Sequence, residues 1–133
     1  MSIFTKLLVA LGLKSKPKKR NGIKCSDPAV KAVYERAIVE ANRRLNKNHF
    51  QRTGPFKGEL TVEVVPNGTD MITTQANEVG AAFGSRKIQV WDKYKTNFEL
   101  AVHECTHILM FQAGYRNESS SHDRRAFPKG GTF

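Results

Sequence analysis

Residues 97–113 form the most sharply bounded segment of the chain, and their pattern predicts an α-helix. Thr96 and Glu99 have the spacing of a capping box, in which the first side chain caps the helix and the second reaches back to it. Gly114 stands where such a helix ends. Apolar residues recur at helical spacing and predict one buried face: Phe98, Ala101, Val102, Cys105, Ile108 and Leu109. We therefore expect a buried, well-capped helix in which Cys105 packs in the core.

Two histidines stand four residues apart within this helix, in the sequence His103-Glu104-Cys105-Thr106-His107. On a helix this spacing puts both imidazoles on one face, one turn apart. Their nitrogens can then bind one tetrahedral zinc ion, at about 2.0–2.1 Å in such sites. Glu104 projects beside the same face, where it can take a proton from an attacking water without binding the metal. The motif therefore predicts Zn²⁺ as the cofactor and Glu104 as the catalytic residue.

A catalytic zinc site normally has three protein ligands and an open position for water, so a third ligand is needed. His49 follows the first predicted helix in a basic segment, and we expect it to face solvent. His122 lies far enough beyond the motif for the chain to turn back to the metal, and it is the predicted third ligand. Glu118 and Asp123 remain carboxylate alternatives. Asp123 or Glu99 is also placed to orient an imidazole by accepting its second N–H.

The other segments predict an α+β fold. Ser26 or Asp27 followed by Pro28 marks the start of a helix that runs to about residue 47. Its apolar stripe predicts core packing: Val30, Val33, Tyr34, Ala37, Ile38, Ala41 and Leu45. Alternation over residues 60–65 predicts a half-buried strand, and residues 79–83 and 87–91 predict two short strands joined by a turn. We expect a leading helix, a small and mostly antiparallel sheet, the helix with two histidines, and a short C-terminal segment that bears a ligand.

The positive charge of the chain is concentrated near its start. The 133 residues have a net charge of +10, and residues 1–25 contain seven of the 22 lysines and arginines but no acidic residue. An apolar stretch, residues 3–13, precedes a basic cluster, residues 14–20. That order opposes export and no small-x-small cleavage site follows, so we expect no signal peptide. We therefore divide the chain into a tail, residues 1–25, and one domain, residues 26–133.

The composition of the tail suggests how it makes contacts. A basic cluster beside apolar side chains suits docking to a partner protein, or nonspecific contact with nucleic acid or an anionic surface. No apolar run in the chain reaches the roughly 18 residues that a membrane span requires. Cys25 and Cys105 do not make a disulfide framework. We expect a cytoplasmic or virion-associated protein.

The order of these elements resembles the SprT-like branch of the zincin metallopeptidases. His103, Glu104 and His107 match the His-Glu-x-x-His motif of that family, and His122 matches its third ligand, which lies in a following helix. The segment from residue 121 to Phe127 is similar to the family's histidine-plus-aromatic signature. Two features differ from the family pattern: Asp123 stands where members often have glycine, and there is no cysteine-based zinc ribbon. The resemblance implies a zincin-like fold in a minimal form.

The function predicted from the motif and the resemblance is zinc-dependent hydrolysis of peptide bonds in a protein or peptide substrate. A substrate strand is expected to pair with the edge of the sheet near Ile88–Trp91. One alternative is a structural or assembly component, for example of a phage particle, that keeps the zincin fold and docks through its tail. Another is a nucleic-acid-binding module that uses the basic tail and is therefore sensitive to salt.

Overall fold

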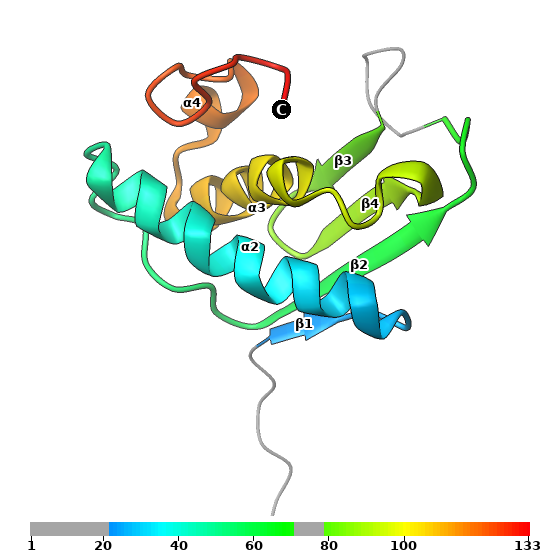
Figure 1. Cartoon of the computed structure of the whole chain (residues 1–133). Helices are drawn as coiled ribbons and strands as arrows, with labels where there is room; N and C mark the ends of the chain where they lie inside the picture. The colour runs from blue at the N-terminus through cyan, green and yellow to red at the C-terminus, as the bar shows by residue number, and fades with distance from the viewer. Residues whose placement is uncertain (1–21, 71–78) are drawn as a thin grey trace, which may run out of the picture.

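The computed structural model describes residues 22–70 and 79–133, which form an α+β fold with one mixed four-stranded sheet (Figure 1). Across the sheet the strands lie in the order β1 (Gly22–Lys24), β2 (Glu59–Val65), β4 (Lys87–Trp91) and β3 (Gly80–Phe83). Most of the predicted tail, residues 1–21, lies outside the described residues. β1 is part of the sheet, although the sequence analysis assigns its residues to the tail.

The prediction of a mostly antiparallel sheet is wrong. β1 and β2 are parallel, as are β2 and β4, whereas β3 and β4 alone form an antiparallel pair. The predicted hairpin over residues 79–91 does form, but its second strand is the one that lies beside β2. β4 therefore runs parallel to β2. The helix α2 (Pro28–Lys47) lies between β1 and β2 in the chain and supplies the crossover connection that two parallel strands require. β4 is also an inner strand, so the prediction that a substrate pairs at the edge near Ile88–Trp91 is wrong as well.

The helix α2 begins as its sequence predicts. The side chain of Asp27 accepts hydrogen bonds from the backbone N–H groups of Ala29 and Val30, at 2.9 and 3.3 Å. The predicted stripe is buried except for Ile38, which is half-buried. The Tyr34 hydroxyl is buried and has no hydrogen-bond partner among the described residues, and its burial raises the pKa of Tyr34.

The helix α3 (Phe98–Ala113) begins one residue later than the predicted cap. Asn97, not Thr96, is the N-cap, because its side-chain oxygen accepts the backbone N–H of Leu100 at 2.9 Å. Gly114 ends the helix in the left-handed conformation, with φ at 90°, as expected for a glycine in this position. The prediction that Cys105 packs in the core is confirmed, since its side chain is fully buried.

A pair of substitutions distinguishes the two cap residues. We expect Asn97→Ala to lower the free energy of unfolding by about 1 kcal/mol, because the first turn of α3 loses a side-chain acceptor. Thr96→Ala should leave it almost unchanged, because Thr96 is exposed and lies before the cap. Urea denaturation of both variants measures the difference. A larger loss of unfolding free energy for Thr96→Ala than for Asn97→Ala would show that Thr96 is the N-cap.

The helices α2 and α3 pack side by side on one face of the sheet (Figure 1). The main core lies between these two helices and the sheet. Its largest fully buried side chains include Tyr34, Leu45, Leu60, Ile88, Leu100 and Ile108. The short helix α4 (Arg116–Ser120) and the C-terminal segment lie together beyond α3, on the side away from β1 (Figure 1). None of the helices in the described ranges has the length and apolar character needed to cross a membrane.

Candidate metal centre

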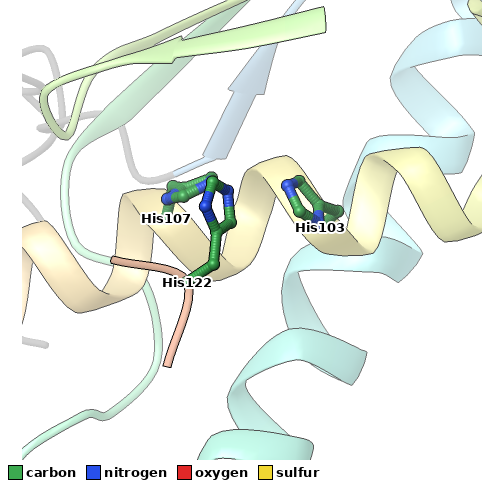
Figure 2. Close-up of side chains that lie close together, drawn as sticks. All are labelled: His103, His107 and His122. Atoms are coloured by element: carbon green, nitrogen blue, oxygen red, sulfur yellow. The ribbon is translucent and has the colours of Figure 1, made fainter. Parts of the chain in front are cut away.

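Three histidines from two parts of the chain meet beside α3. His103 and His107 project from successive turns of this helix, and His122 reaches toward them from the segment after α4 (Figure 2). The ring centroids are 5.0 Å apart for His103 and His107, and 4.9 Å apart for His107 and His122. One ring nitrogen from each histidine lies within 4.8 Å of the others. The three predicted ligands therefore come together.

The position of His122 depends on two reversals of the chain. Gly114 ends α3, α4 makes one short turn, and the N–H of His122 then donates to the carbonyl of Ser119 at 3.2 Å. His122 has a positive φ of 54°, a left-handed conformation that is uncommon for residues other than glycine. Such strain persists only where the surrounding structure holds it, and it is frequent at functional sites. His49 also has a positive φ, of 73°, but it is exposed and lies outside the cluster.

The three imidazoles pack against one buried aromatic ring. The centroid of Phe127 lies 5.0 Å from that of His103, 4.5 Å from that of His107 and 5.0 Å from that of His122. Phe127 is only 3% exposed. The cluster is therefore closed on one side by an apolar side chain, which lowers the local polarity.

Burial and crowding keep two of the imidazoles neutral. Burial lowers the pKa of His103 to about 4, with a further contribution from His122. Burial also lowers the pKa of His107 to about 3, with His103 and His122 adding to the effect. A neutral imidazole has a free lone pair, which is the form that binds a metal ion. Both side chains are thus ready to act as ligands at pH 7.

Hydrogen bonds orient two of the histidines. The Nδ1 atom of His107 lies 2.7 Å from Oγ of the buried Ser119. His103 makes a hydrogen bond to the backbone of Thr132. The contact with Ser119 engages Nδ1 of His107 and leaves its Nε2 as the atom that can bind a metal ion, as is usual for histidines that bind metals.

The groups that the sequence analysis proposed for this orienting role are engaged elsewhere. Asp123 forms an ion pair with Arg125 at 2.8 Å, and Glu99 forms one with Arg44 at 3.3 Å. Among the described residues, the ligand-capable group that comes together contains the three histidines and neither Glu118 nor Asp123. The sequence does not predict the role of Ser119, because a serine twelve residues after His107 gives no signal until the path of the chain is known.

Glu104 lies beside the cluster and is directed toward the sheet. Its side chain is 4% exposed, the carboxylate being covered by β3. A Cβ atom added at Gly80 would lie 3.4 Å from Oε2 of Glu104 and 3.3 Å from a methyl carbon of Leu100. The absence of a side chain at Gly80 therefore makes room for the carboxylate between α3 and the edge strand.

The donor set suits a transition metal ion. Imidazole nitrogen is a good ligand for zinc, copper, iron and nickel, whereas calcium and magnesium prefer oxygen. Three histidine ligands are also the number that leaves a tetrahedral ion one open position. The cluster thus fits a divalent transition metal, and its ligand number and type fit zinc.

The neutral histidines predict a loss of stability in acid for the metal-free protein. In the unfolded chain these imidazoles titrate near 6.5, whereas in the folded protein their pKa values are about 4 for His103 and about 3 for His107. Below pH 6.5 the unfolded chain therefore binds more protons, so its population rises. From pH 7.5 to 5 we expect the free energy of unfolding to fall by up to about 2 kcal/mol for each of the two imidazoles.

Urea denaturation of the chelator-treated protein at the two pH values measures this loss. His107→Gln serves as the matched variant, because it removes one of the two titrating groups and should flatten the dependence. Equal free energies of unfolding at both pH values would contradict the prediction.

Comparisons with known proteins give no match for this chain. No protein-family model matches it, and no curated protein and no solved structure shows significant similarity to it.

Proposed function

We propose that this protein is a zinc-dependent peptidase of the SprT-like zincin type. The observation that supports this best is the meeting of three imidazoles beside a buried glutamate on the same helix. Structural zinc sites are usually closed by four ligands, many of them cysteines, whereas three histidines with an open position are typical of catalytic sites. The residue order His-Glu-x-x-His adds a base next to the ligands.

The roles follow from the chemistry of each side chain. His103, His107 and His122 would hold the ion, with Ser119 and the backbone of Thr132 fixing two of the rings. When bound, zinc supplies a Lewis acid that polarises a carbonyl and lowers the pKa of water. Glu104 would take a proton from the attacking water and later give it to the leaving amine.

The edge of the sheet supports a peptide as the substrate. Within the described sheet, β3 is an edge strand that pairs only with β4. An extended peptide could add to its other side through backbone hydrogen bonds, a common mode of peptide recognition. Because Gly80 of this strand lies against Glu104, a peptide paired there would run close to the base. This replaces the expectation that the substrate pairs at β4.

Metal removal tests the proposal. Purified protein should contain about one zinc ion per chain and should cleave an unfolded protein substrate such as casein. A chelator should abolish cleavage, and zinc added back should restore it. The proposed hydrolysis depends on the zinc that the three histidines bind. Protein that cleaves equally well without zinc would therefore overturn the proposal. So would zinc-loaded protein that cleaves no protein or peptide substrate in a broad library.

A further inference from the structure

A second feature of the molecule, separate from the histidines, is an apolar groove between β1, α2 and the loop before β2. The groove has a volume of about 460 Å³. It is lined by Gly22, Ile23, Glu35, Ile38, Val39, Asn42, Pro55 and Phe56. It lies on the β1 side of the molecule, whereas α4 and the C-terminal segment lie on the other side (Figure 1). None of its lining residues belongs to the metal centre.

The groove exposes apolar surface that a folded domain usually covers. Val39 is 68% exposed. Among the large apolar side chains of the described residues, it has the greatest exposed fraction. Ile38 and Phe56 beside it are only partly buried. A segment that covers these side chains would remove their apolar surface from water, which is favourable. We therefore expect the groove to bind an apolar segment that lies near it in the chain.

We propose that residues 3–13 of this same chain bind in the groove. Eight of these eleven residues are apolar: Ile3, Phe4, Leu7, Leu8, Val9, Ala10, Leu11 and Leu13. Several of them have the spacing of one helical face, as in peptides that bind an apolar groove through residues three and four apart. The segment thus offers the kind of surface that Ile38, Val39 and Phe56 would bury.

The distance along the chain favours this occupant. Gly22 is the first described residue, and it lines the groove itself. Residues 14–21 connect it to the apolar segment, and eight residues span at most roughly 27 Å. An eleven-residue helix is only about 16 Å long. The connection therefore reaches every part of the groove, and so short a link gives an effective concentration on the order of millimolar. A second copy of the chain would need that concentration in free solution to compete.

Charge favours the same arrangement. The connecting residues carry the basic cluster, five lysines and arginines between positions 14 and 20. Glu35 lies in the wall of the groove, and Glu59 is the neighbour of Gly22 across the sheet. With residues 3–13 in the groove, the basic cluster, which leads to Gly22, would lie near these two carboxylates. The attraction adds to the apolar contact.

Methyl NMR on the full chain tests the proposal. We expect nuclear Overhauser contacts between methyl groups of Leu7 or Leu8 and those of Ile38 or Val39. Val39→Asp should abolish these contacts, because it puts a charge in the groove. The exposed Ala29→Asp adds the same charge to the first turn of the same helix, outside the groove, and should leave the contacts intact.

Two results would overturn the proposal. One is a wild-type spectrum without contacts between the two groups of methyls, which would leave the groove to a different occupant such as a membrane surface or another protein. The other is contacts that weaken on dilution and appear between labelled and unlabelled chains, because these would assign the groove to a second copy. Contacts that persist on dilution and occur within one chain support it. The metal and the peptidase reaction play no part in this experiment.

Discussion

Replacing Glu104 with Gln is expected to abolish peptide hydrolysis while the protein keeps its zinc. Gln has almost the shape of Glu but cannot accept a proton, so the base is lost and the packing between α3 and β3 is kept. General bases contribute on the order of 10²–10⁴ to a rate, and we expect kcat to fall by that factor. The zinc content should stay at its wild-type value, because Glu104 is not part of the three-histidine cluster.

Glu99→Gln is the matched control for this experiment. Glu99 begins the same helix, but its carboxylate is exposed and pairs with Arg44. The variant should keep both zinc and activity. Two results would contradict the role of Glu104: cleavage by Glu104→Gln at the wild-type rate, or a Glu104→Gln protein that no longer binds zinc. The second result would make the glutamate a ligand or a structural residue.

Local patterns were sufficient to predict α2, α3 and the three histidines. The stripe of α2 and the four-residue spacing of His103 and His107 depend on the geometry of one helix, which a sequence displays directly. His122 could be predicted because few other ligands were available within reach of the motif. In each case the relevant contacts are local, or the number of candidates is small.

The order and direction of the strands could not be predicted in the same way. The pattern of residues 79–91 indicates a hairpin, but it does not say which of its strands lies beside β2. That choice depends on contacts between segments far apart in the chain. The error reversed the expected direction of β4 and moved the expected edge of the sheet.

The residues around the histidines show the same limit. A carboxylate near a ligand in the sequence was expected to orient it, yet Asp123 and Glu99 each have an arginine closer in space. A serine on α4 fills the role for His107 because two turns of the chain bring it there. The capping box placed the N-cap of α3 one residue too early for a related reason. Asn97 is also a strong N-cap residue, and only the backbone angles show which of two adjacent residues caps the helix.

Removing the third imidazole tests the geometric basis of the site. We expect His122→Ala to lower the affinity for zinc by more than about 100-fold, since even groups that only orient a ligand change it by 10–100-fold. Competition against a chromophoric chelator measures the affinity. Zinc should also raise the melting temperature of the wild type, and that rise should be lost in the variant, because a ligand stabilises only the state that binds it.

The backbone at this position requires its own control. His122 has a positive φ, and alanine is strained there, so part of any effect on stability comes from the backbone. His49→Ala puts the same strain at a second left-handed histidine that lies outside the cluster, and it should bind zinc as the wild type does. His122→Asn tolerates the left-handed conformation better and should recover stability without recovering zinc. If His122→Ala bound zinc as tightly as His49→Ala, the third ligand would have to be another residue, and the peptidase site would lose its geometric basis.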